Sequence, residues 1–557
     1  MKQASVREAA SLLAYSLFVA LFFNVYRWLP DPGILTVLAP PVEALLGLGA
    51  LTLLARRGPQ PPQTVAILVI SAFCSALILF GIGEGFYQAV FRQSFVPATD
   101  LRFLPALLNM VFETRLFEDV LLVILPFALL IGAVAGLLFL LFRRLTTRLQ
   151  TAGQSAILLA SSVLFALFLA QTVVEIATPA PPAPDDDSAL PVSVRLAYQL
   201  IPPRVTPSFS EQERAPSVYE RESDEESAFA LPGIEDRDIH LFVVESYGHT
   251  LFTHPEHRRL MRPYYEELEA RVRAAGYTAY SSFMVSPAFG GRSWLADATM
   301  LSGVFLDSQH EFEQMMGSGR ANLTKELGEA GYHRVLAAPG TTRARGDWRR
   351  FHEFDQYLIS GDFSYEGPPI SFGNIPDQYL IHRANELAAP EASPLFLMYM
   401  LVSTHVPMNR IPPYVSEASD LGNGAIFHEL PVRTFRNNWV FGAEYPEGYT
   451  TGIDYTLRSV VDFLTQVDDS PLAVIIGDHQ PRIPVSESDA TFSVPVHVLS
   501  RDVSVVAPFA AYGFREGFVP DAQLAAHAGE HRRMDELRRM ILDVARGATA
   551  DAVRAEQ

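Results

Sequence analysis

The chain has 557 residues, 49% of them hydrophobic, and a positive mean hydropathy, which is unusual for a soluble protein of this size. Its formal net charge of −19 argues against a nucleic-acid partner, because nucleic acids are bound by basic surfaces. The only cysteine, Cys74, has no second cysteine to pair with, so a folded domain in this chain must be held together by its own core.

Five apolar segments are concentrated in the first third of the chain, and each has about the length needed to cross ~30 Å of hydrocarbon. A buried core helix is the alternative for any one of them, but five in succession with few internal charges predict a transmembrane domain over residues 1–177. The first segment is too long for a cleavable signal peptide, and more segments follow it. The five segments are Ser11–Leu29, Ile34–Ala55, Thr64–Ala89, Asp119–Phe142 and Gln154–Ile176.

Basic residues at the segment ends predict the orientation, since cytoplasmic loops carry an excess of lysine and arginine. With a cytoplasmic N-terminus and five spans, everything after Ile176 lies outside the cytoplasm. The long external stretch Phe91–Phe117 has the spacing of an amphipathic surface helix, with a re-entrant or packing segment as the alternative. The residues on the cytoplasmic side are then Lys2, Arg7, Arg56, Arg57, Arg143, Arg144 and Arg148, against Arg27, Arg92 and Arg102 outside.

Residues 178–234 are rich in proline, aspartate, glutamate and serine and predict a solvated linker, with one short helix near Val194–Leu200. From residue 235 to 557, strand and helix patterns alternate, which predicts one α/β domain with a mostly parallel sheet between helices. The predicted strands are Ile239–Val244, His333–Ala337, Leu395–Val402, Leu472–Ile476 and Val494–Leu499. The predicted helices are Arg258–Ala275, Leu323–Ala330, Ile375–Ala388, Thr450–Gln466 and Arg532–Arg546.

Polar side chains follow two of these strands directly. Glu245 ends the first strand, and Asp478 and His479 come after Gly477 at the end of the run Leu472–Ile476. Open α/β sheets bind ligands at the carboxyl ends of their strands, so two carboxylates and an imidazole there predict a divalent-metal site. An oxygen-rich set suits Mn²⁺ or Mg²⁺ and allows Zn²⁺. The alternatives are a rim salt bridge or helix cap for Glu245, and a surface turn for the Gly-Asp-His triplet.

A hydroxyl follows a flexible turn at Gly290-Gly291. Ser293 begins a stretch with helical character, where it is either an N-cap or a nucleophile activated by a neighbouring metal. Backbone N–H groups at a helix start also hold phosphate. Thr299 and Ser302 are weaker candidates for the nucleophile, and His405 lies just past the predicted strand Leu395–Val402.

The order of these residues after five spans resembles the lipoteichoic acid synthase branch of the alkaline phosphatase/sulfatase superfamily. The resemblance implies transfer of phosphoglycerol from a phospholipid, phosphatidylglycerol, to an extracytoplasmic glycan, lipid or polymer through a phosphoserine. It places the enzyme in a bacterial cytoplasmic (inner) membrane with a periplasmic, sulfatase-like catalytic domain. The implied residues are Glu245, Asp478 and His479 as ligands of one metal ion, Ser293 as nucleophile and fourth ligand, and Trp348, Arg350 and His405 as head-group-binding residues.

Two departures from the family leave the substrate open: the nucleophile is serine where relatives use threonine, and Thr341-Thr342 stand where they have a histidine. A phosphoethanolamine transferase, with His428 or His497 as an extra histidine, is the nearest alternative. A membrane-anchored phosphodiesterase or sulfatase-like hydrolase is another, although Ser293 lacks the sulfatase Pro and Arg context. A lipid-binding sensor without catalysis is the non-enzyme alternative and is expected to lack one of the four metal-site residues.

Overall fold

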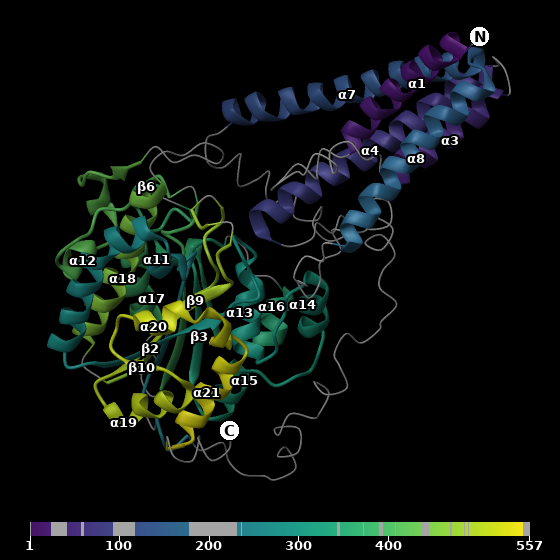
Figure 1. Ribbon diagram of the computed structural model, residues 1–557. Helices are drawn as coiled ribbons and strands as arrows, with labels where there is room; N and C mark the ends of the chain where they lie inside the picture. The colour runs from purple at the N-terminus through teal and green to yellow at the C-terminus, as the bar shows by residue number, and fades with distance from the viewer. Residues whose placement is uncertain are drawn as a thin grey trace. The chain divides into compact units, whose positions relative to one another are not determined.

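The computed structural model describes most of the chain (Figure 1). It divides into two compact units, Met1–Ala215 and Pro216–Gln557, and each is considered by itself. The described residues are 2–23, 42–56, 61–92, 117–177, 231–234, 237–341, 346–370, 372–388, 394–406, 408–435, 445–467, 470–483, 485–487 and 489–549.

The described part of the first unit is helical, and each of the five predicted apolar segments overlaps one helix. Leucine and phenylalanine side chains from several helices pack into one cluster that includes Leu12, Leu51, Leu77 and Phe142. The helices are α1 (Lys2–Phe23), α3 (Val42–Arg56), α4 (Pro61–Phe91), α7 (Phe117–Thr151) and α8 (Gln154–Ala177).

Within the described residues, one helix is long and apolar enough to cross a membrane: the segment Gln63–Gly85 of α4, with a mean hydropathy of 2.7. The segment Gln154–Leu169 of α8 is apolar but shorter. That five helices span the membrane therefore stays a prediction. The predicted helix near Val194–Leu200, and most of the predicted surface helix Phe91–Phe117, lie outside the described residues.

The second unit is built on a nine-stranded sheet with the strand order β10-β2-β9-β8-β1-β5-β3-β4, in which β11 also pairs with β2. The run from β8 to β4 is parallel, whereas β9 is antiparallel to both of its neighbours. This confirms a mostly parallel sheet. The strands are β1 (Ile239–Val244), β2 (Thr278–Val285), β3 (His333–Ala338), β4 (Gln356–Ile359), β5 (Leu395–Leu401), β8 (Leu472–Gly477), β9 (Ser493–Ser500), β10 (Arg515–Glu516) and β11 (Arg532–Arg533), with β6 (Arg410–Ile411) and β7 (Arg433–Thr434) as a separate pair.

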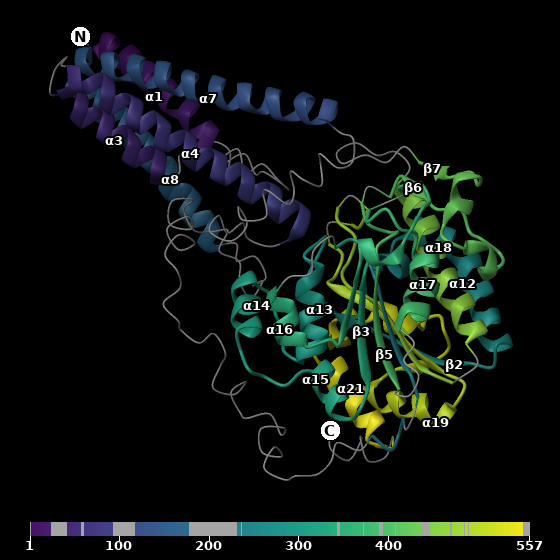
Figure 2. The ribbon, with the colours of Figure 1, turned by 180° about the vertical axis from the view of Figure 1, so that it is seen from behind.

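Helices cover both faces of the sheet (Figures 1 and 2). Alternate residues of β1 point to opposite faces, so Phe242 and Val244 join the core under α12, α17 and α18, while Leu241 and Val243 join the core under α13, α15 and α21. The helices are α11 (Thr250–Thr253), α12 (Pro255–Ala274), α13 (Ser293–Ser302), α14 (Gln309–Met316), α15 (Leu323–Glu329), α16 (Gly346–His352), α17 (Asp377–Ala388), α18 (Tyr445–Gln466), α19 (Val503–Val506), α20 (Ala522–Ala526) and α21 (Glu536–Ala545). Short 3₁₀ helices lie at Ser360–Phe363, Ala418–Leu421, Ala425–His428, Ala507–Tyr512 and Ala528–Glu530.

The fold includes residues just before the predicted domain start at 235. Leu231 and Ile234 are buried in the core beneath α21. The backbone N–H of Gly233 donates to the Ala545 carbonyl at 2.8 Å, and a Cβ at Gly233 would lie 2.0 Å from the Val544 carbonyl oxygen. The segment Leu231–Ile234 therefore packs as part of the second unit.

Candidate metal centre and nucleophile

The site is built first by the pairing of β1 with β8. These strands are parallel neighbours in the register Val244 to Gly477, so Glu245 and Asp478 leave the sheet side by side at its carboxyl edge. Gly477 is required here by close packing, since a Cβ would lie 2.0 Å from the carbonyl oxygen of Tyr247. The strand pairing thus brings together two carboxylates that are distant in the sequence.

Glu245, Asp478 and His479 form a cluster in which one ligand atom from each lies within 4.8 Å of the others. His479 Nε2 lies 3.5 Å from Glu245 Oε1 and 3.4 Å from Asp478 Oδ2. Two atoms each about 2.1 Å from one tetrahedral ion are about 3.4 Å apart. The three side chains, all buried, therefore have the spacing of ligands around a single ion.

Hydrogen bonds orient the ligand atoms. Asp478 Oδ1 accepts from the backbone N–H groups of Ser246, at 2.7 Å, and His479, at 2.6 Å. His479 Nδ1 lies 2.8 Å from the Gln480 carbonyl oxygen, which can only accept, so Nδ1 carries the proton. The lone pair of Nε2 then faces the carboxylates. When His479 is neutral, this tautomer, fixed by a backbone carbonyl, is the form of histidine that binds metals.

The electrostatics of the cluster show an excess of negative charge. Burial, and then repulsion by Glu245, raise the pKa of Asp478 to about 7. The pKa of His479 is raised: burial works against this, but the charges of Asp478 and Glu245 outweigh it. The pKa of Glu245 is lowered despite its burial, because His405 and His479 favour its charged form. A buried site with this charge balance suits a divalent cation, which would neutralise it.

Ser293 opens α13 and faces the cluster. Its Oγ donates to Glu245 Oε2 at 3.3 Å and lies 3.3 Å from His479 Nε2. The N-cap of α13 is Arg292, whose side chain makes no capping hydrogen bond. The Ser293 hydroxyl thus contacts the candidate ligands instead of capping the helix, and its distances are again close to those between ligands of one tetrahedral ion.

The turn before Ser293 is tied to the segment that carries Asp478. Ser286 Oγ donates to the Asp478 carbonyl at 2.5 Å, and the N–H of Gly290 donates to the Gln480 carbonyl at 3.0 Å. Arg292 adopts the left-handed region, with a φ of 63°. These bonds hold the start of α13 against the end of β8.

The two weaker nucleophile candidates take part in the far end of α13. Thr299 Oγ1 accepts from the N–H of Leu306 at 3.0 Å, and Ser302 Oγ accepts from the N–H of Val304 at 3.2 Å. Both side chains are fully buried. Their hydroxyls therefore hold the turn after α13, whereas the hydroxyl of Ser293 faces the acidic cluster.

The three predicted head-group residues have different surroundings. His405 is half-buried, donates from Nδ1 to the Val406 carbonyl at 2.8 Å and stacks on Phe372 at 3.9 Å between ring centroids. Trp348, on α16, is buried in the cluster that includes Leu295 of α13. Arg350 is exposed on α16, and among the described residues no hydrogen bond or ion pair joins it to the metal cluster. The charge of His405 favours the ionised form of Glu245.

Asp297 is a further candidate site residue that the sequence did not predict. It lies one helical turn after Ser293 on α13 and is fully buried, and among the described residues neither of its carboxyl oxygens has a hydrogen-bond partner. Burial, followed by repulsion from Asp478 and Glu245, raises its pKa well above the ordinary value. The signal available in the sequence was the spacing of four residues, which puts Asp297 and Ser293 on the same face of a helix.

Two hydroxyls brace the backbone around Glu245. Thr404, beside His405, donates to the Glu245 carbonyl. Tyr449, from α18, donates to the Ser246 carbonyl at 2.7 Å and accepts from the N–H of Gly248 at 3.2 Å. The strand ends of β1 and β5 and helix α18 thus all support the loop that carries the first carboxylate.

No protein-family model matches the chain, and no curated protein matches it. It is similar to the solved structure of the lipoteichoic acid synthase LtaP from Listeria monocytogenes (12% identity, TM-score 0.32), over 49% of this chain and 66%, just under two thirds, of LtaP. It is also similar to the phosphoglycerol transferase GacH of Streptococcus pyogenes in complex with sn-glycerol-1-phosphate (13%, TM-score 0.34), over 56% of this chain and 85% of GacH.

A third similar structure is the integral membrane lipooligosaccharide phosphoethanolamine transferase A (EptA) of Neisseria meningitidis (14%, TM-score 0.45), matched over 97% of this chain and 95% of EptA. Because all three TM-scores are below 0.5, the assignment of the site rests on the geometry of its residues. The solved structures to which the chain is similar include members of both transferase branches considered from the sequence, phosphoglycerol and phosphoethanolamine transferases.

Proposed function

We propose that the chain is a membrane-anchored, metal-dependent phosphotransferase that moves a phospholipid head group to an extracytoplasmic acceptor through a phosphoserine at Ser293. The observation that carries the proposal is the position of the Ser293 hydroxyl, 3.3 Å from both Glu245 Oε2 and His479 Nε2. A serine hydroxyl is a weak nucleophile unless a base or a metal activates it. A metal ion bound by Glu245 and His479 would lie next to the Ser293 hydroxyl and could activate it.

The reaction balances in two displacements at phosphorus. In the first, Ser293 Oγ loses its proton and bonds to the phosphorus of the donor, the bond from phosphorus to the diacylglycerol oxygen breaks, and that oxygen takes up a proton. In the second, an acceptor hydroxyl loses its proton and bonds to the same phosphorus, the bond from phosphorus to Ser293 Oγ breaks, and Oγ takes up a proton. A divalent ion held by Glu245, Asp478 and His479 would lower the pKa of the hydroxyl and offset charge on the phosphoryl oxygens. Backbone N–H groups at a helix start, where Ser293 lies, can also hold phosphate oxygens.

We propose one ion per chain, since Glu245, Asp478 and His479 are the one such group among the described residues. His479 Nε2 lies 3.4–3.5 Å from one oxygen of each carboxylate, so all three side chains could bind the same ion. Two carboxylates and one imidazole form an oxygen-rich set, which suits Mn²⁺ or Mg²⁺ and allows Zn²⁺.

Phosphoglycerol is favoured over phosphoethanolamine as the transferred group by the positions of two histidines. His497, weighed above as an extra metal-site histidine, lies in the core between Tyr247 Oη, at 2.9 Å, and Ser281 Oγ, at 2.8 Å. His428 Nε2 donates to the Glu366 carbonyl at 3.1 Å. Neither belongs to the metal-binding group, so the extra histidine typical of phosphoethanolamine transferases is not supplied by these two residues.

We further propose that residues 1–177 form a five-helix domain in a bacterial cytoplasmic membrane, that 178–234 form a linker and that 235–557 form a periplasmic catalytic domain. The arginines at one side of the predicted spans support this orientation. The donor is then a phospholipid, phosphatidylglycerol, and the acceptor a hydroxyl of a glycan, lipid or polymer outside the cytoplasm. Trp348, Arg350 and His405 are assigned to binding the head group.

The test is turnover by the purified full-length protein in nanodiscs that contain phosphatidylglycerol or phosphatidylethanolamine, with Zn²⁺ or Mn²⁺ added. Diacylglycerol and the modified acceptor are measured by mass spectrometry. We expect diacylglycerol from phosphatidylglycerol, loss of turnover in Ser293→Ala, and normal turnover in the matched helix variant Ser302→Ala. Release of free glycerol phosphate without acceptor would indicate a hydrolase. Turnover that persists in Ser293→Ala would overturn the proposal.

A further inference from the structure

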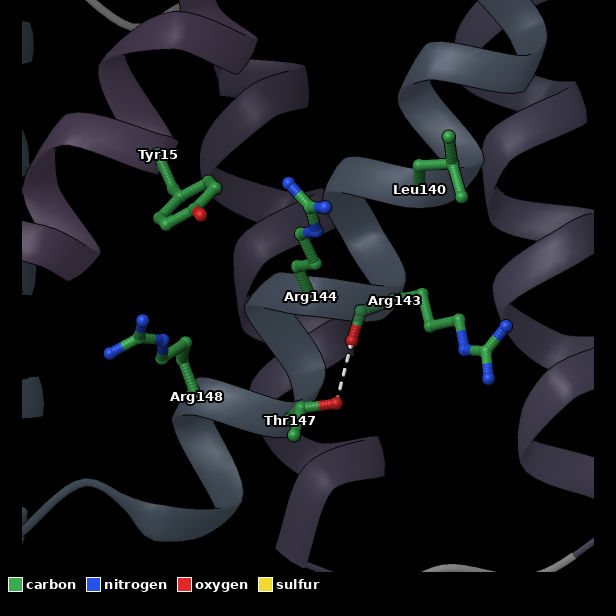
Figure 3. A pocket seen from close by; sticks show the side chains of 6 residues that line it. All are labelled: Tyr15, Leu140, Arg143, Arg144, Thr147 and Arg148. Atoms are coloured by element: carbon green, nitrogen blue, oxygen red, sulfur yellow. Dashed lines mark hydrogen bonds between the residues drawn. The ribbon is translucent and has the colours of Figure 1, made fainter.

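A second polar site lies in the helical unit, between α1 and α7. It is a pocket of about 490 Å³ near the carboxyl end of α7. Its lining combines cationic, hydroxyl and apolar side chains: Tyr15, Leu140, Arg143, Arg144, Thr147 and Arg148 (Figure 3). It belongs to a different structural unit from Ser293.

The pocket carries positive charge, and within the described part of the chain no acidic side chain is paired with its arginines. Among the described residues, no ion pair or hydrogen bond engages the guanidinium groups of Arg143, Arg144 or Arg148. The carboxylate of Glu8, an acidic residue of α1, instead accepts a hydrogen bond from the N–H of Gly153 at 3.3 Å. Cationic side chains gathered around a cavity without an acidic partner attract an anion.

Two of the cationic side chains lie on the side of α7 that faces Tyr15. Figure 3 shows Arg144 and Arg148 extending from α7 on the side of Tyr15, whereas Arg143 extends in the other direction. Arg144 and Arg148 are one turn apart, so both lie on the same face of α7. The Thr147 hydroxyl donates its proton to the Arg143 carbonyl at 3.0 Å. It therefore has no proton left to donate to an anion. The two guanidiniums on the Tyr15 side therefore supply the donors for an oxyanion.

The apolar surroundings identify what carries the anion. Leu137 and Leu140, one to two turns before Arg144 on α7, are 39% and 54% exposed. Both leucines lie within the predicted fourth span, which ends at Phe142. The arginines come just after it, where the hydrocarbon of the membrane is expected to end. An exposed apolar strip leading to a basic pocket is complementary to a molecule with acyl chains and a phosphate. Arginines that served only to set membrane orientation would require no such cavity.

We propose that the pocket formed by Tyr15, Arg144 and Arg148 binds the phosphate of an anionic phospholipid of the cytoplasmic leaflet. The inference rests on the membrane placement proposed above. In that placement the arginines lie on the cytoplasmic side and the catalytic domain outside, so the bound lipid is a structural ligand and not the donor. Guanidinium groups pair with phosphate oxygens in bidentate fashion, which lysine cannot reproduce.

The test measures lipid retention by native mass spectrometry and thermal stabilisation of the full-length protein in detergent. The probes are dioleoyl phosphatidylglycerol, dioleoyl phosphatidylcholine and inorganic phosphate. We expect phosphatidylglycerol alone to be retained and to stabilise. The double variant Arg144→Gln/Arg148→Gln should bind it less tightly, on the order of tenfold per arginine. Arg144→Lys/Arg148→Lys, which keeps the charge, should fall between, and Arg56→Gln, at the end of α3, should bind like the unaltered protein.

Equal retention by the double glutamine variant and the unaltered protein would overturn the proposal. Equal binding of phosphatidylcholine would overturn the requirement for an anionic head group, and stabilisation by inorganic phosphate alone would replace the lipid with a free anion. A C-terminal alkaline phosphatase fusion is assayed in parallel. An inactive fusion would refute the membrane orientation and hence the proposed function, whereas loss of lipid specificity with an active fusion would refute the lipid site only.

Discussion

The hydroxyl of Ser293 lies 3.3 Å from Nε2 of His479, although 186 residues separate the two in the chain. The contact exists because the turn before α13 is hydrogen-bonded to the end of β8, through Ser286 and Gly290. It joins a nucleophile candidate to a metal-ligand candidate. Each of the following predictions tests one consequence of this arrangement or of the packing around it.

Ser293→Ala should reduce turnover on the order of a thousandfold or more, because it removes the attacking oxygen. Metal content should persist, since Glu245, Asp478 and His479 remain. Ser293→Thr should keep part of the activity, because a threonine hydroxyl occupies the same position. The readouts are turnover, metal per chain by elemental analysis, and phosphopeptide mapping of trapped enzyme. A phosphate mapped to Thr299 would show that the nucleophile is wrongly assigned.

Removal of the metal should abolish turnover, and one equivalent of ion per chain should restore it. Glu245→Gln should weaken binding on the order of a hundredfold or more, because a neutral amide replaces a charged ligand. Glu417→Gln, an exposed glutamate of the same unit, serves as the matched control and should bind normally. Titration followed by calorimetry gives both stoichiometry and affinity. Two tight ions per chain would contradict the single-ion site.

Gly477→Ala should destabilise the second unit by roughly 3 kcal/mol or more. The added Cβ would lie 2.0 Å from the Tyr247 carbonyl oxygen, so the ends of β1 and β8 must separate. Metal affinity should fall with stability, because Glu245 and Asp478 follow those ends. Gly361→Ala, where an added Cβ meets no atom within 4 Å, should leave both unchanged. Denaturant unfolding and metal titration of the two variants make the comparison.

Asp297→Asn should stabilise the metal-free protein, on the order of 1–3 kcal/mol at neutral pH, because it removes a buried carboxyl that has no hydrogen-bond partner. The same change should weaken metal binding, since a bound cation would favour the ionised form of Asp297 and an amide cannot ionise. A general loss of structure would lower both stability and metal affinity, whereas here stability should rise while metal affinity falls. Asp420→Asn, on the surface, is the control and should change neither quantity. A destabilised metal-free Asp297→Asn protein would refute the prediction.

His497 should make stability depend on pH. Burial lowers its pKa from 6.5 to about 3, so the folded state keeps it neutral while the unfolded state takes up a proton below pH 6.5. The free energy of unfolding should therefore fall as the pH is lowered from about 6.5 toward 3, by about 1.4 kcal/mol per pH unit for this residue.

Denaturant unfolding between pH 7 and 4 checks this slope. In His497→Gln the slope should be smaller by that amount, although the variant is less stable overall because the bonds to Tyr247 and Ser281 are weakened. His310→Gln, an exposed histidine, should keep the slope of the unaltered protein. An identical slope in the His497 variant would contradict the prediction.

The local sequence pattern was sufficient to predict the strands that consist of continuous apolar runs. The strand Ile239–Val244 was predicted with the bounds that β1 has, and Leu472–Ile476 differs from β8 by one residue. Strand β2, Thr278–Val285, escaped prediction because serines interrupt its apolar residues; the Ser281 hydroxyl is satisfied by His497 and by the Gly517 carbonyl, which no local pattern reveals. The burial of His497 could not be predicted either, because its partners, Tyr247 and Ser281, are distant in the sequence.

The sequence by itself determined the α/β class, the parallel sheet and the strand-end positions of Glu245, Asp478 and His479, since buried runs and the residues after them are local properties. Only the tertiary structure decided that β1 and β8 are neighbours, which brings those three side chains within 4.8 Å. It also placed the Ser293 hydroxyl against Glu245, and it buried Asp297 without a hydrogen-bond partner among the described residues. These outcomes depend on strand order and on loop hydrogen bonds between distant segments, and such contacts leave no periodic trace in the chain.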